Sequence, residues 1–72
     1  MDVQEIIDFT CDVNPREKTF AEGAGDSLKK LVGRLTPEDG AMVRGLIIDF
    51  GLEIAMDMLN SALDYAEASY EA

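Results

Sequence analysis

The residues best suited to chemistry are a row of acids in the second half of the chain. Polar, mostly acidic side chains recur there at steps of three or four: Asp49, Glu53, Asp57, Asn60, Asp64, Glu67 and Glu71. At about 100° per residue, this spacing holds all seven within roughly 40° of one line along an α-helix. Such a row attracts basic surfaces and metal ions, and it repels phosphate groups.

Metal binding does not follow from this row. Helical carboxylates bind paired iron ions in four-helix bundles, but those sites combine Glu with His and point inward. The chain has no His, and we expect the row to face outward. The alternating acids and central Gly of a calcium loop are missing as well. The sequence therefore predicts no metal ion and no cofactor.

Catalysis by a nucleophile is also not indicated. Cys11 is the lone cysteine, and the chain offers no His to activate it. We expect a buried structural thiol at this position. The segment 23–30 (GAGDSLKK) superficially suggests a phosphate loop, but it lacks the Walker pattern, and Asp26 would repel a phosphate. We predict a plain linker followed by a helix cap at this segment, and a protein that is not an enzyme.

One long helix must carry the acid row. Thr36 suits the capping position of a helix and Pro37 its first turn, so we predict a helix from Pro37 to Glu71. Gly45 and Gly51 each cost about 1 kcal/mol relative to Ala inside a helix. Two helices separated by a break between Arg44 and Gly51 therefore remain an open alternative.

The other sides of this predicted helix are apolar. One flank carries Val43, Ile47, Phe50, Ile54, Met58 and Tyr65, and the other carries Ile48, Leu52, Leu59, Leu63, Ala66 and Tyr70. Small residues lie opposite the acids, namely Gly51, Ala55, Ala62 and Ser69. A helix that is apolar nearly all round is buried. Both flanks and the back of this helix therefore need cover from the rest of the chain or from another chain.

The first half of the chain reads as two shorter helices. We predict one from Asp2 to about Cys11 and a second that runs to Leu35 from a cap at Asp26 or Ser27. Between them we expect a turn over 15–18 and a flexible connector over 21–25. The outer face of the second helix is basic, with Lys29, Lys30 and Arg34. These cations either are solvated or pair with the acids of the long helix, in the same or a neighbouring subunit. The whole, residues 1–72, is predicted to be a single all-α domain of three helices.

Size and charge restrict the partners. A chain of 72 residues buries only about 60% of its unfolded surface, yet 47% of these residues are apolar, so we expect a homodimer. The net charge is −9, which disfavours direct nucleic-acid binding. Residues 41–59 contain four charged side chains, each costing roughly 2.5–3.5 kcal/mol at mid-bilayer, so we expect no membrane span. A lone Cys and no recognisable secretion signal favour the cytoplasm.

Two functions of different class fit these features. In the first, the acid row mimics nucleic acid and binds a larger basic, nucleic-acid-binding protein. The residues predicted to bind that partner are Asp49, Glu53, Asp57, Asp64, Glu67 and Glu71. Phage inhibitors of host defence complexes, including anti-CRISPR proteins, are similar to this chain in size and charge. In the second, the chain is a homo-oligomeric adaptor or antitoxin-like subunit that acts through its apolar flanks, and the acids only confer solubility.

Overall fold

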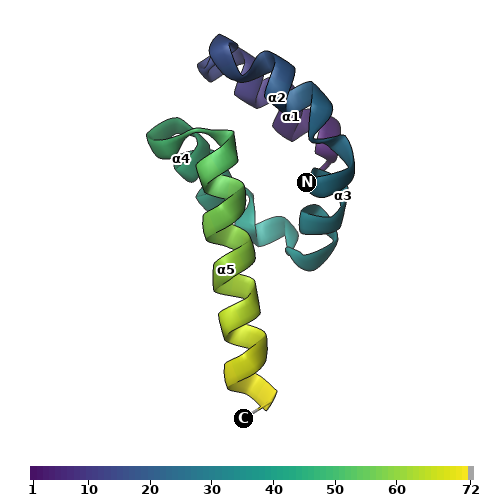
Figure 1. The fold of residues 1–72 in the computed structure, drawn as a ribbon, viewed down its shortest axis with the longest axis vertical. Helices are drawn as coiled ribbons and strands as arrows, with labels where there is room; N and C mark the ends of the chain where they lie inside the picture. The colour runs from purple at the N-terminus through teal and green to yellow at the C-terminus, as the bar shows by residue number, and fades with distance from the viewer. Residues whose placement is uncertain (72) are drawn as a thin grey trace.

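The computed structural model describes residues 1–71, with side chains as far as Ser69 (Figure 1). These residues form helices and no strand, so the predicted all-α class is confirmed. The five α-helices are α1 (Val3–Val13), α2 (Lys18–Gly23), α3 (Gly25–Arg34), α4 (Gly40–Phe50) and α5 (Leu52–Glu71). Short 3-10 helices, Pro15–Glu17 and Pro37–Asp39, precede α2 and α4. The predicted count of three helices is wrong for two reasons. Residues 18–23 form an additional helix, and the predicted long helix is divided into α4 and α5 at Gly51.

The first predicted helix matches α1 to within two residues at its end. Ile6, Ile7 and Thr10 are its buried residues, and the Thr10 hydroxyl donates a hydrogen bond of 2.8 Å to the carbonyl of Ile6. This bond is what allows a polar side chain to be fully buried. The helix ends before Pro15, since the residue that precedes a proline disfavours helical geometry.

The predicted flexible connector over 21–25 is wrong. Its first three residues complete α2, and Gly25 already belongs to α3. Ala21 is completely buried and Ala24 is 9% exposed, because small side chains let these short helices pack closely. No side chain caps α3, so the predicted cap at Asp26 or Ser27 is also wrong, although α3 covers the predicted helix.

All five helices contribute to one hydrophobic core. α1 packs against α2, α3 and α4, while α5 packs against α3 and α4. The buried apolar residues are Ile6, Ile7, Ala21, Ala24, Leu28, Leu31, Val43, Ile47, Leu52, Ala55, Met56 and Leu59. Four of these twelve lie in the first eight residues of α5, so the start of that helix is fixed by the core.

The start of the predicted long helix is confirmed, but only as a 3-10 turn. The Asp39 carboxylate accepts hydrogen bonds from the Thr36 backbone N–H at 2.9 Å and from the Thr36 hydroxyl at 3.1 Å. These bonds hold the corner between α3 and the turn Pro37–Asp39. The α-helical geometry begins only at Gly40.

The long helix itself is broken at Gly51. This residue has φ 89° and ψ 164°, a conformation open essentially to glycine alone. A Cβ atom there would lie 2.9 Å from Oε1 of Glu17. The prediction of one helix from Pro37 to Glu71 is therefore wrong, and the alternative of two helices is correct, with the break at Gly51.

The molecule is elongated because α5 extends beyond the other helices. Its principal extents are 41 × 21 × 20 Å, and the C-terminal part of α5 runs below the remaining helices in Figure 1. Within residues 61–69, Leu63 is half-buried and every other residue is exposed. Across the part of the chain that the structure describes, no helix combines the length and the apolar character needed to cross a membrane.

Candidate protein-interaction surface

The position of α5 is set by a carboxylate from far along the chain. Glu17 accepts hydrogen bonds from the backbone N–H of Leu52 at 2.8 Å and of Glu53 at 3.2 Å. The side-chain amide of Asn14 donates a third bond of 2.9 Å to Glu17. Because the first N–H groups of a helix have no partner within it, a carboxylate there both satisfies them and complements the helix dipole. Glu17 thus serves as the cap that Gly51 has no side chain to supply.

α5 presents three distinct faces. The buried face carries Leu52, Ala55, Met56 and Leu59. A second face carries the acid row, and a third carries the apolar side chains Ile54, Met58 and Tyr65, which are 51%, 41% and 77% exposed. At about 100° per residue, the centres of these faces lie roughly 110–130° apart. Of the two predicted apolar flanks of α5, the chain buries Leu52 and Leu59 of one and leaves Ile54, Met58 and Tyr65 of the other exposed.

The acids of the row on α5 are accessible from Glu53 to Glu67. Glu53, Asp57, Asp64 and Glu67 are all exposed, and Asn60 between them is half-buried. The spacing of the predicted row therefore holds from residue 53 onward. It fails at Asp49, which is exposed but lies on α4, across the break at Gly51. Glu71 ends α5, and its side chain lies outside the described residues.

Arg34 of α3 binds the distal half of this row. Its Nη2 atom lies 2.8 Å from Oδ1 of Asp64 and 3.0 Å from Oε2 of Glu67, and its Nη1 atom donates a longer hydrogen bond of 3.4 Å to Asn60. The two carboxylate side chains keep 70% and 73% of their surface exposed, against 31% for Arg34. Pairs this exposed contribute only about 0.2–1 kcal/mol each.

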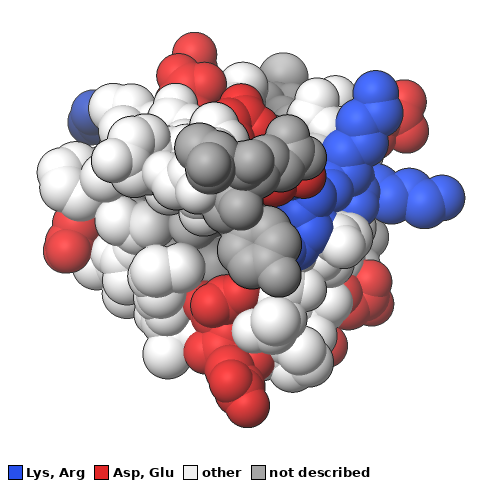
Figure 2. Space-filling view, turned by 90° about the horizontal axis from the view of Figure 1, so that it is seen from below, with Lys and Arg blue, Asp and Glu red and all other residues white. Residues whose placement is uncertain are grey.

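The charges around this end of the molecule are unevenly distributed. Figure 2 views the C-terminal end and shows Lys and Arg gathered mainly on one side, while Asp and Glu appear around several margins. α3 supplies the exposed cations Lys29, Lys30 and Arg34. The acid row is thus one of several negative regions of the surface, and the basic face of α3 lies next to its distal half.

Sequence reasoning found part of this site. Pairing of Arg34 with the acids was one of the alternatives it left open, and the structure shows that pairing within one chain. The cap by Glu17 was missed, since nothing in the sequence links residues 35 positions apart. The one available signal was Gly51, because a helix that starts after a glycine must find its capping group elsewhere.

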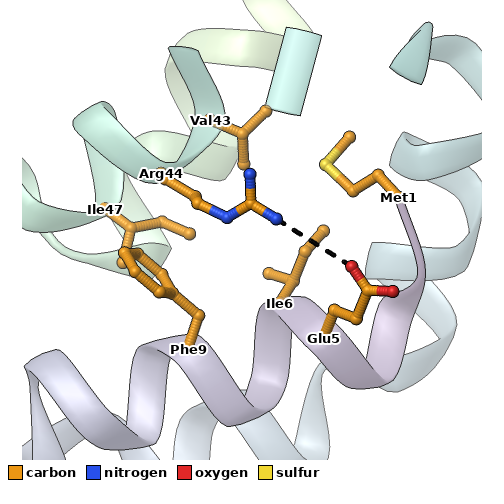
Figure 3. Close-up of a pocket in the computed structure, with 7 residues that line it drawn as sticks. All are labelled: Met1, Glu5, Ile6, Phe9, Val43, Arg44 and Ile47. Carbon is orange, nitrogen blue, oxygen red and sulfur yellow. Dashed lines mark ion pairs between the residues drawn. The ribbon is translucent and has the colours of Figure 1, made fainter. Parts of the chain in front are cut away.

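Two hollows lie on the surface of the described residues. The cavity in Figure 3, between α1 and α4, measures about 10 Å³, which is room for roughly one water molecule. At its rim, Nη2 of Arg44 lies 3.9 Å from Oε2 of Glu5. A shallow hollow of about 310 Å³ is lined by apolar and hydroxyl-bearing residues: Thr19, Phe20, Gly23, Ala24, Ser27 and Met56. The prediction that the protein is not an enzyme stays a prediction.

Metal ligands are not clustered in the part of the chain that the structure covers. No group of three or more His, Cys, Asp or Glu side chains there is arranged to hold an ion. Cys11 is half-buried, not fully buried as the sequence suggested. Comparisons with known protein families, with curated proteins and with solved structures found no match. The faces of α5 are therefore interpreted from their own geometry.

Proposed function

We propose that this chain is a non-enzymatic, cytoplasmic inhibitor or regulator that binds a larger protein through the acidic face of α5. The partner surface is basic and normally binds nucleic acid. The observation that supports this proposal is the exposed row Glu53, Asp57, Asp64 and Glu67 on one face of a helix that projects from the core. Anti-CRISPR proteins and other phage inhibitors of defence complexes provide the analogy, through their size and charge.

The geometry of the row suits mimicry of a phosphate backbone. Glu53 and Asp57 lie about 6 Å apart along the axis, and Asp64 and Glu67 about 4.5 Å, at a rise of 1.5 Å per residue, in the general range of phosphates along a nucleic-acid strand. The neutral Asn60 separates the two acid pairs, so Asp57 and Asp64 lie about 10 Å apart. Electrostatic attraction of this kind acts mainly on the rate and specificity of association. The chain itself, with net charge −9, would be repelled by nucleic acid and by anionic lipid.

The two halves of the row contribute unequally to this proposal. Arg34 already neutralises part of the charge on Asp64 and Glu67. Glu53 and Asp57 make no ion pair with another described residue, so they carry the larger net negative potential. We expect them to provide most of the attraction, while Asp64 and Glu67 use their exposed oxygens to accept further hydrogen bonds from the partner.

Capture from a bacterial lysate tests the proposal. The immobilised chain should retain nucleic-acid-binding proteins at low salt. Added duplex DNA should release them, because the DNA and the acid row compete for the same basic surface. Glu53→Lys with Asp57→Lys should abolish the capture. The matched control is Asp12→Lys with Glu22→Lys, which changes the net charge equally at exposed acids of α1 and α2. Equal loss with both pairs, or capture that neither DNA nor salt weakens, would contradict the proposal.

A second function is supported by the open flank of α5. Ile54, Met58 and Tyr65 are more than two-fifths exposed, which is unusual for three apolar side chains on one helical line. They favour a homo-oligomeric adaptor or antitoxin-like subunit, most simply a homodimer, that acts through its apolar faces. Changing Glu53, Asp57 and Asp64 to Lys would leave this function intact and would destroy the first.

A further inference from the structure

The open flank of α5 continues to the end of the described side chains. We define the apolar stripe as the uncharged residues within about 60° of one line on this helix. They are Ile54, Met58, Ser61, Ala62, Tyr65, Ala68 and Ser69. All seven are exposed. The stripe therefore offers a continuous contact surface, and none of the residues that form it is charged.

The side-chain sizes along the stripe allow it to pack against a second, antiparallel copy of itself. If two copies of α5 run antiparallel about a point between Ser61 and Ala62, Met58 of each copy meets Tyr65 of the other. The same register places Ile54 opposite Ser69, so a large side chain faces a small one. Small residues at the centre allow the backbones to approach, and a methionine sulfur beside an aromatic ring is a favourable contact.

We propose that a second copy of this chain docks on the apolar stripe, with the two α5 helices antiparallel and a two-fold axis between Ser61 and Ala62. The proposal deepens the second function above, because it names the partner and the contact. Charge permits this pairing. The acid row lies roughly 120° from the stripe, so two chains of net charge −9 meet without opposing their carboxylates.

The two-fold axis also fixes where the acid rows lie. In an antiparallel pair, both rows fall on the same side of the two helices, and both cores fall on the other side. A parallel pair would place the rows on opposite sides. The proposed dimer thus presents two acid rows on one face, which also fits the first function.

The contact area is modest for a stable dimer. From Ile54 to Ser69 the stripe extends about 22 Å at 1.5 Å per residue, and a typical stable interface buries about 800 Å² on each partner. The antiparallel arrangement places the bare second half of each α5 along the first half of the other copy's α5, which the core holds in position. We expect a dissociation constant in the micromolar range.

Cysteine cross-linking tests the register. In a Cys11→Ser background, Ala62→Cys lies next to the axis and should give a covalent dimer on oxidation, since the two Cα atoms come close enough for a disulfide. Ile54→Cys and Ser69→Cys should each form no covalent dimer alone and should cross-link to each other when mixed. Light scattering of the native chain should rise from 7.9 kDa towards twice that mass with concentration.

The outcomes separate this inference from the acid-row function. Self-cross-linking of Ile54→Cys would indicate a parallel pair and overturn the inference. A mass that stays at 7.9 kDa at millimolar concentration, with no cross-link at Ala62→Cys, would overturn it as well. Circular dichroism of each variant should match that of the native chain, which checks that the variant is folded. Glu53→Lys with Asp57→Lys leaves the stripe unchanged, so this variant should still form the dimer even though it no longer captures a basic partner. Failure of the acid-row function and failure of the dimer are therefore distinguishable.

Discussion

The two halves of α5 differ in what holds them. In the first half, Leu52 and Leu59 are 1% and 4% exposed, and Glu17 caps the helix. In the second half, over 61–69, no side chain is fully buried, and the ion pairs of Arg34 connect the helix to the core. One helix therefore contains a segment fixed by packing and a segment that the chain leaves almost bare.

This difference supports the proposed docking of a second copy on the second half of α5. Isolated helices shorter than about 12–15 residues are only marginally stable in water, so most helical stability in proteins comes from packing. The second half of α5 gains little from the core and has most to gain from another chain. Regions that bind partners are commonly drawn from the less stable parts of a structure.

Shortening a core side chain should have the largest effect. Leu59→Ala removes a 4% exposed side chain and should lower the free energy of unfolding by about 2–5 kcal/mol. Its neighbour Met58 is 41% exposed, so Met58→Ala should change stability by no more than about 0.5 kcal/mol in dilute solution. Urea denaturation followed by circular dichroism measures both. Similar losses for the two variants would remove the distinction between the buried and open faces.

Filling the break should cost slightly less. Gly51→Ala forces a backbone geometry that L-residues avoid, at about 1–3 kcal/mol, and it pushes a Cβ atom against the Glu17 carboxylate. Gly45→Ala is the matched control, because no atom beyond its chain neighbours and the backbone of its own helix lies within 4 Å of the position that its Cβ atom would take. That variant should gain about 0.5–1 kcal/mol. Thermal unfolding measures the pair, and a stabilising Gly51→Ala would mean that α4 and α5 form one helix after all.

Loss of the cap should weaken the first half of α5. Glu17→Ala leaves the N–H groups of Leu52 and Glu53 without their acceptor, at a cost of about 0.5–2 kcal/mol. Glu22→Ala removes an exposed acid of α2 that has no such bond and should be nearly neutral. Glu17→Gln keeps one acceptor oxygen and should fall between them. Chemical denaturation of the three variants checks this order.

Breaking the exposed ion pairs should have the smallest effect. Arg34→Met removes both pairs and should cost about 1 kcal/mol or less at low salt, and still less in high salt, which screens such pairs. Lys30→Met, an exposed cation of the same helix, is the control. Urea denaturation at two salt concentrations measures both. A large loss that salt does not reduce would show that Arg34 is essential for the fold.

Much of this structure follows from local patterns in the sequence. The apolar spacing of Ile6, Ile7 and Thr10 predicts α1, and Leu28 with Leu31 predicts α3. The period of the acids from Glu53 onward predicts one face of α5. These features depend only on neighbours along the helix, so the sequence contains the information needed to place them.

The features that were not predicted depend on contacts between distant residues. Gly51 is compatible with a helix, and the break there is accompanied by a cap from Glu17, which is distant in the sequence. Ala21 and Ala24 resemble a linker beside their glycines, but packing against the core makes them helical and buried. Neither choice can be read from local propensity, because tertiary packing decides it.

Residue-resolved amide hydrogen exchange along α5, at low and high protein concentration, tests most directly the claim that the two halves of this helix differ. Residues 52–60 should be protected at both concentrations. Residues 61–69 should exchange much faster in dilute solution and become protected as the concentration rises, when a second copy covers them. Equal protection along the whole helix at every concentration would contradict the claim.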